Sequence, residues 1–249
     1  MDNNPNKGEN NLLVSKEQFH TEPKIVNGKV YSNEQINALF QSLLDVESQK
    51  EVSELLMTYF EENPFFDSYD PALLAFLTNF FDPQSEYGMD GVNAAARIIS
   101  SLLIYSVDHE ENRILKYYMN QDFYNAIWPF FTESRYVILI FQYIIYSEEY
   151  AIYPTAYHFL LENNILDVLS SLLHPDYVFL VDIICFIRSF NSYFRRQKKS
   201  ENPKFKEYFL DTYEDFINGI SMLIPHLCEI VFSSDVFKVL RYGCGCLGS

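Results

Sequence analysis

Three stretches, AARIISSLLIY at 95–105, VILIFQYIIYS at 137–147 and FLVDIICFIRS at 179–189, align at a constant offset of 42 residues. In each stretch apolar residues recur every three or four positions, which gives a helix one apolar stripe. Repetition at such a period is typical of stacked α-helical repeats. The sequence therefore predicts an all-α repeat fold. The aligned columns are Ala95/Val137/Phe179, Ile99/Phe141/Ile183, Leu102/Ile144/Phe186 and Leu103/Ile145/Ile187, and one column, Ile98/Ile140/Asp182, breaks the apolar pattern.

A second helix precedes each of the last two stretches and repeats at the same offset. Its apolar positions also follow helical spacing, so each unit contains at least two helices. Short polar turns join the two helices of a unit. The matching columns of the preceding helix are Phe123/Ile165, Tyr124/Leu166, Ile127/Leu169, Phe130/Leu172 and Phe131/Leu173.

Helix-start signals extend the pattern toward the N-terminus. Ser32 with Gln35 has the spacing of a capping box, and Asp70-Pro71 places a proline at a first helical position. The chain is therefore predicted to contain paired helices joined by shorter ones. The pairs lie near 36–60, 71–105, 122–147, 162–194 and 216–247, and the shorter helices lie near 109–119, 150–160 and 203–213.

The composition divides the chain into two parts. Residues 1–30 are rich in Asn, Lys and Glu without clear periodicity, and we expect a disordered N-terminal tail. Residues 31–249 form the predicted helical repeat domain. The chain has 48% hydrophobic and 17% aromatic residues, which is ample material for a packed core.

The charge and the cysteines restrict the partners and the compartment. A formal net charge of −16 disfavours a nucleic-acid partner, because phosphate repels such a surface; it favours basic partners or simply solubility. The chain has four cysteines and no signal-peptide pattern, which indicates free thiols in a reducing compartment. We therefore expect it in the cytoplasm, the nucleus or both. The longest apolar run, 136–141, is far shorter than a membrane span, so we expect no membrane association.

The repeats resemble the armadillo/HEAT family over residues 33–249. The segment 164–176, NILDVLSSLLHPD, is similar to a second armadillo helix with its turn, and 237–249 is similar to a third helix. The resemblance implies a right-handed α-solenoid of about five repeats, whose third helices line a groove that binds extended peptides. In the karyopherin-α branch these helices carry a Trp and, four residues later, an Asn. The corresponding pairs here, Ser101/Tyr105, Tyr143/Ser147 and Cys185/Ser189, contain neither residue.

Motifs that would indicate catalysis or a cofactor occur only as formal matches. The segment 243–248 fits GxGxxG, but a helical pattern precedes it and no helix can follow before the chain ends. The segment 246–249 fits a prenylation box poorly, since Gly248 stands where an aliphatic residue is expected. His226 and Cys228 match no zinc module, and packed thiols explain them more simply. We therefore expect no enzyme, no cofactor and no metal.

One basic cluster lies where the 42-residue period is interrupted. About 17 extra residues separate the last two turns, and this insertion is rich in Lys and Arg. It is predicted either to bind an acidic partner, to act as a nuclear-localisation signal, or to be a solvated loop. Its basic residues are Arg195, Arg196, Lys198, Lys199, Lys204 and Lys206.

The resemblance also implies which residues line the groove, namely those about one turn from the inward stripe of each third helix. We expect a non-enzymatic protein-interaction scaffold that binds an extended or basic segment of another protein. The alternatives are a divergent nuclear-transport or trafficking adaptor and, without positive support, an enzyme. The tyrosines among the expected groove residues could equally pack in the core. The expected groove residues are Arg97, Ser101, Tyr105, Tyr136, Tyr143, Ser147, Ser189 and Ser192.

Overall fold

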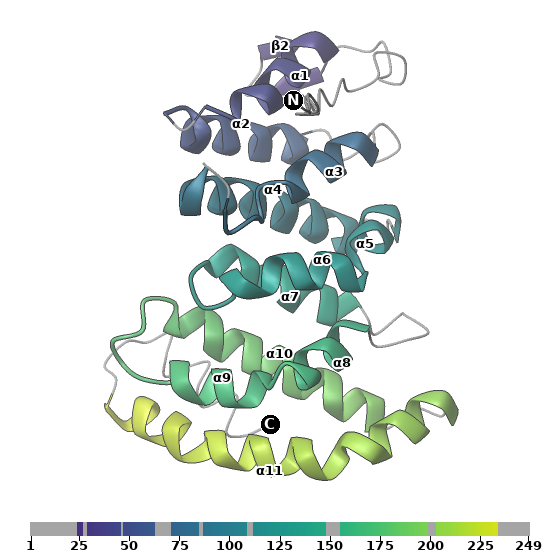
Figure 1. The fold of residues 1–249 in the computed structure, drawn as a ribbon, viewed down its shortest axis with the longest axis vertical. Helices are drawn as coiled ribbons and strands as arrows, with labels where there is room; N and C mark the ends of the chain where they lie inside the picture. The colour runs from purple at the N-terminus through teal and green to yellow at the C-terminus, as the bar shows by residue number, and fades with distance from the viewer. Residues whose placement is uncertain are drawn as a thin grey trace, which may run out of the picture.

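The protein is a stack of helices that runs from α1 at one end to α11 at the other (Figure 1). The computed structural model describes residues 24–26, 29–45, 47–62, 71–84, 87–108, 112–147, 155–198 and 203–233. Neighbouring helices pack against one another along the stack. The predicted helical fold is thus confirmed, with one short β-hairpin added to it.

The first four predicted helix pairs and two of the three shorter helices are present. The capping box is also formed: the Ser32 hydroxyl accepts from the Gln35 amide and the Gln35 side chain accepts from the Ser32 amide. Pro71 opens its helix as predicted. The helices are α1 (Asn33–Ser42), α2 (Gln49–Glu62), α3 (Pro71–Thr78), α4 (Gly88–Asp108), α5 (Asn112–Tyr118), α6 (Gln121–Ile127) with the 3-10 turn η2 (Trp128–Phe130), α7 (Arg135–Ser147), α8 (Thr155–Glu162), α9 (Ile165–Leu172), α10 (Leu180–Lys198) and α11 (Pro203–Ser233).

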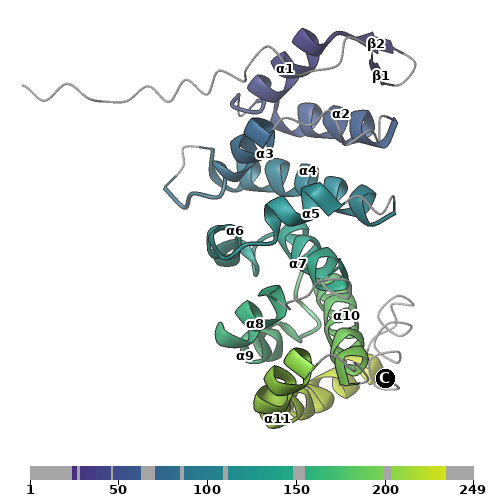
Figure 2. The same cartoon turned by 90° about the vertical axis from the view of Figure 1, so that its right-hand side faces the viewer.

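The helices lie in two rows. Helices α2, α4, α7 and α10 form the first row, in which each helix packs on the next. Helices α1, α3, α6, α8, α9 and α11 form the second row beside it (Figure 2). The stack is bowed, and the first row lies on the inner side of the bow.

The N-terminal boundary differs from the prediction. Strands β1 (Lys24–Val26) and β2 (Lys29–Tyr31) pair antiparallel, and all of their residues except Tyr31 fall in the segment 1–30 that was expected to be disordered. The pairing of Val26 with Lys29 leaves the sequence Asn-Gly between the strands, the dipeptide most typical of two-residue hairpins. Helical periodicity, on which the prediction for the rest of the chain rests, does not indicate strands. Residues 1–23 lie outside the described part of the chain.

The repeat columns form the core. Ile99, Phe141 and Ile183, which share one column, are all fully buried. Phe141 lies at the centre of an aromatic cluster, with its ring centroid 5.9 Å from that of Phe131 and 6.1 Å from that of Phe159. Residues that are 42 positions apart in the sequence therefore occupy equivalent places in successive layers, where their side chains are buried between the helices.

Polar contacts also join successive layers. The Ser134 hydroxyl donates to Asn93 Oδ1 at 2.6 Å, and the Tyr177 hydroxyl donates to the Thr132 carbonyl at 2.9 Å. Burial, with the nearby Asp182 charge as a second cause, raises the pKa of Tyr177 to about 12. Tyr177 therefore stays protonated and keeps its donor over the physiological pH range.

The C-terminal end corrects the prediction of a separate short helix at 203–213. Helix α11 is one continuous helix of 31 residues that passes through Pro225. No glycine or proline lies between residues 204 and 218, so nothing in the sequence interrupts the helix where a break was expected. The second helix of the fifth predicted pair falls in 234–249, outside the described residues.

Candidate interaction surface

The first row presents one solvent-facing strip that crosses its helices. Helix α4 packs against α2 and α7 on its two flanks and against α3 and α5 behind, and α7 packs likewise against α4, α10 and α8. The more exposed side chains of these helices therefore face away from the second row. We call this surface the inner strip. It includes Asn93, Arg97 and Ile104 of α4, Arg135, Leu139, Gln142 and Tyr146 of α7, and Val181, Cys185 and Arg188 of α10.

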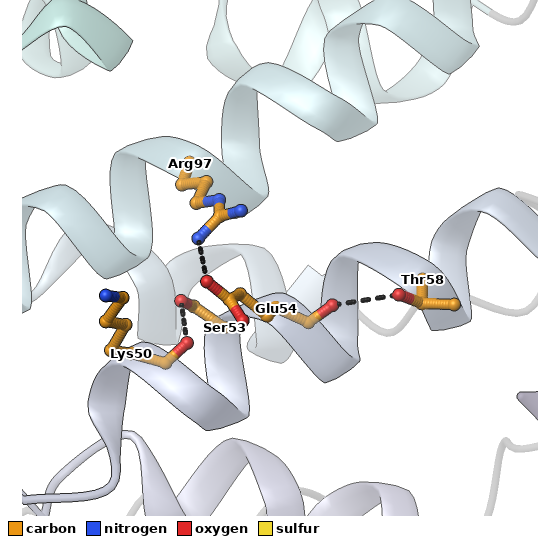
Figure 3. A network of polar contacts seen from close by, with 5 residues as sticks. All are labelled: Lys50, Ser53, Glu54, Thr58 and Arg97. Atoms are coloured by element: carbon orange, nitrogen blue, oxygen red, sulfur yellow. Dashed lines mark hydrogen bonds and ion pairs between the residues drawn. The ribbon is translucent and has the colours of Figure 1, made fainter. Parts of the chain in front are cut away.

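A chain of charged and aromatic contacts runs along the strip across four helices. Arg97 Nη1 lies 3.2 Å from Glu54 Oε1 of α2 (Figure 3). The Arg97 guanidinium carbon also lies 5.8 Å from the ring centroid of Tyr136, and so does that of Arg135. Arg135 Nη2 in turn lies 3.1 Å from Asp182 Oδ1 of α10. We call these five residues the charged ladder.

The ladder explains the one column that breaks the apolar pattern. Ile98 and Ile140 are fully buried, whereas Asp182 at the equivalent position is partly exposed and pairs with Arg135. Exposed ion pairs contribute only about 0.2–1 kcal/mol each, and an exposed cation–π contact contributes about 0.5–1 kcal/mol. The ladder therefore orients side chains along the strip more than it stabilises the stack.

The structure brings together only part of the groove predicted from the sequence. Arg97 and Tyr136 meet in the ladder, and Tyr143 is partly buried against the core. Ser101 and Ser147 are buried, and their hydroxyls donate to the carbonyls four residues earlier, so neither presents a hydroxyl to solvent.

The structure describes the remaining predicted groove residues only in part. Ser189 and Ser192 are partly buried on α10. The backbone of Tyr105 belongs to α4, and its side chain lies outside what the structure describes. Of the predicted groove residues whose side chains are described, only Ser101 and Ser147 are thus buried.

Two columns of the same alignment are partly or fully exposed, and of their six residues only Arg97 was selected from the sequence. They are Arg97/Leu139/Val181 and Ile104/Tyr146/Arg188. The equivalents of Arg97 at 42 and 84 residues later, Leu139 and Val181, were not among the expected groove residues. Tyr146, 44% exposed, is the clearest omission. Applying the period to Arg97 would have identified Leu139 and Val181 directly.

The basic insertion is largely helical rather than a loop. Arg195, Arg196 and Lys198 belong to the end of α10, and Lys204 and Lys206 belong to the start of α11. Their side chains, and Lys199 altogether, lie outside the described part of the chain. The loop alternative is therefore wrong for the backbone of these five residues, and the binding and localisation alternatives stay predictions.

The described residues contain no group of three or more His, Cys, Asp or Glu side chains placed to hold a metal ion. His226 and Cys228 are partly buried on α11, and Cys185 is partly buried on α10. Residues 243–249, with their formal cofactor and lipid motifs, lie outside the described ranges.

Comparisons find no family model, no curated protein and no solved structure that this chain matches. Among the described helices, none is both long enough and apolar enough to cross a membrane.

Proposed function

We propose that this chain is a right-handed armadillo-like α-solenoid that acts as a non-enzymatic scaffold. In this proposal the inner strip binds an extended segment of another protein. The observation that carries the proposal is the regular repetition of the strip. Residues of three successive first-row helices, such as Arg97, Leu139 and Val181, recur in one column along it.

The spacing of the columns supports an extended ligand. Packed helices lie about 8–10 Å apart, and an extended chain advances about 3.3 Å per residue. One helix step therefore corresponds to about three residues of the bound segment. A segment of about seven residues would cross from α4 to α10.

The chemistry of the strip supports a partner with both apolar and charged side chains. Ile104, Leu139, Val181 and Tyr146 offer partly exposed apolar surface between the charges of the ladder and Arg188. Aromatic residues and arginines are the side chains that most often dominate binding energy at interfaces. The partner is accordingly expected to use a few anchoring side chains on an extended backbone.

The test is selection of linear peptides from a random display library on the immobilised full-length chain. Selected peptides are expected to lose binding when Tyr146→Ala and Arg188→Ala are combined, because each anchor typically contributes about 2 kcal/mol or more. Shortening a selected peptide below about seven residues should also weaken binding. Fluorescence anisotropy measures both effects.

The control variant is Val178→Ala, since Val178 is 85% exposed but lies in the turn before α10, outside the strip. It should bind the peptides as the wild type does. The melting temperature of the double variant should stay within a few degrees of the wild type. Unchanged binding by the double variant, or failure of any linear peptide to bind, would contradict the proposal.

A further inference from the structure

A cleft of about 560 Å³ opens on the second row, between the α8–α9 turn and α11. Figure 2 shows that α8, α9 and α11 lie in the row opposite α7 and α10. The cleft is therefore separate from the inner strip. Its volume falls within the range of about 300–1,000 Å³ that is typical of ligand sites.

The floor of the cleft is apolar. Leu161, Ile165, Leu166 and Met222 line it, and Met222 is 58% exposed. The helices approach closely here because Gly219 has no side chain: a β-carbon at this position would collide with Leu166. The close contact fixes α11 against α9 at one edge and leaves the cleft open beside it.

The rim of the cleft is acidic. The carboxylates of Glu162 and Asp167 line it together with the amides of Asn164 and Asn218. Glu162 Oε1 lies 3.1 Å from His158 Nδ1, which orients this carboxylate along α8. Among the described residues, no lysine or arginine lines the cleft, and His158, which does line it, is already paired with Glu162. A ligand at the rim therefore meets negative charge.

The turn that carries part of the rim has an unusual backbone. Asn164 adopts the left-handed conformation, with φ 55°, and makes no side-chain cap on α9. Asparagine tolerates this conformation better than most residues, so the tight reversal between α8 and α9 is locally encoded. It brings Glu162 and Asp167, on two different helices, to the edge of one cleft.

We infer that the cleft binds a lysine or arginine side chain of a basic polypeptide segment. The aliphatic stem of such a side chain covers the apolar floor while its cation meets the two carboxylates. An anionic ligand would be repelled, and a purely apolar one would partly desolvate both carboxylates while supplying no cation in place of the water it displaces. The net charge of −16 attracts basic segments from a distance. This assignment does not rest on the proposed role of the inner strip.

The test is a titration of the full-length protein, with labelled Ile, Leu and Met methyl groups, by the peptide Gly-Lys-Leu-Lys-Gly. Methyl resonances of Ile165, Leu166 and Met222 are expected to shift. A peptide with norleucine in place of both lysines keeps the stems but removes the cations, and it should bind at least tenfold more weakly. The double variant Glu162→Gln, Asp167→Asn should weaken the lysine peptide at least tenfold.

The control is the double variant Asp122→Asn, Glu133→Gln, which removes two exposed carboxylates outside the cleft and makes the same charge change. It should alter the affinity less than twofold. Equal losses in both double variants would mean diffuse attraction by the acidic surface and would overturn the site. The small diamine 1,4-diaminobutane tests the assignment to a polypeptide. If it displaces the peptide at concentrations below the peptide's own Kd, the cleft prefers a small amine and this assignment is overturned. A failure of the inner-strip peptides would leave these outcomes unaffected.

Discussion

Helix α7, in the middle of the stack, and helix α11, at its C-terminal end, bury their apolar residues to different extents. Seven of the 13 residues of α7 are buried. Helix α11 exposes Ile217, Met222, Ile224 and Phe232 within the part whose side chains are described. Helix α7 has first-row neighbours on both flanks, whereas α11 packs against α9 and α10. An apolar side chain thus contributes more or less to stability according to the neighbouring helices that the fold supplies.

The largest expected effect comes from making the same substitution in the two helices. Phe141→Ala removes a fully buried ring from the aromatic cluster and should lower the free energy of unfolding by about 3–5 kcal/mol. Phe232 is 87% exposed, so Phe232→Ala should change stability by less than about 0.5 kcal/mol. Urea denaturation measures both. Equal losses would show that the end of the stack is as tightly packed as its middle.

The next effect concerns the contact that fixes α11. Gly219→Ala should destabilise the protein by about 1 kcal/mol, because the collision with Leu166 outweighs the higher helix propensity of alanine. A Leu166→Ala background removes the two closest contacts, with Cδ1 and Cγ, and keeps only the β-carbon at 3.1 Å, so the same substitution should cost clearly less stability there. A stabilising effect in both backgrounds would mean that α11 moves away from α9 without cost.

A smaller effect is expected from the charged ladder. Two double-mutant cycles should each give a coupling energy of about 0.2–1 kcal/mol. One combines Glu54→Gln with Arg97→Gln, and the other combines Arg135→Gln with Asp182→Asn. Both couplings should shrink in 1 M salt, where the screening length falls to about 3 Å. Couplings that persist unchanged in high salt would show that the ladder is shielded from solvent.

The smallest effect concerns pH. Because burial raises the pKa of Tyr177 from 10.0 to about 12, the folded state holds this proton more tightly than the unfolded state does. The resulting stability is complete below pH 10 and is lost as the pH rises toward 12. The difference in unfolding free energy between wild type and Tyr177→Phe should therefore be constant up to about pH 9 and then decrease. A difference that stays constant up to pH 12 would contradict the shift.

The candidate sites were only partly accessible from the sequence. Arg97 and Tyr136 were selected and do meet, because the period places them on facing helices. Ser101 and Ser147 were selected wrongly, since a polar residue on a helix can satisfy its hydroxyl on its own backbone and be buried there. The cleft on the second row was missed entirely. Its carboxylates, Glu162 and Asp167, meet residues of α11 more than 50 positions later in the chain.

The sequence by itself determined the helices, most of their boundaries and the apolar columns that bury one another. These properties follow from local propensity and from a period that is visible along the chain. Only the tertiary structure decided which side of each helix meets solvent, how Asp182 pairs with Arg135, and where a cleft opens beside Gly219. These depend on the angles and distances between whole helices, because a rotation of a few tens of degrees exchanges a buried column for an exposed one.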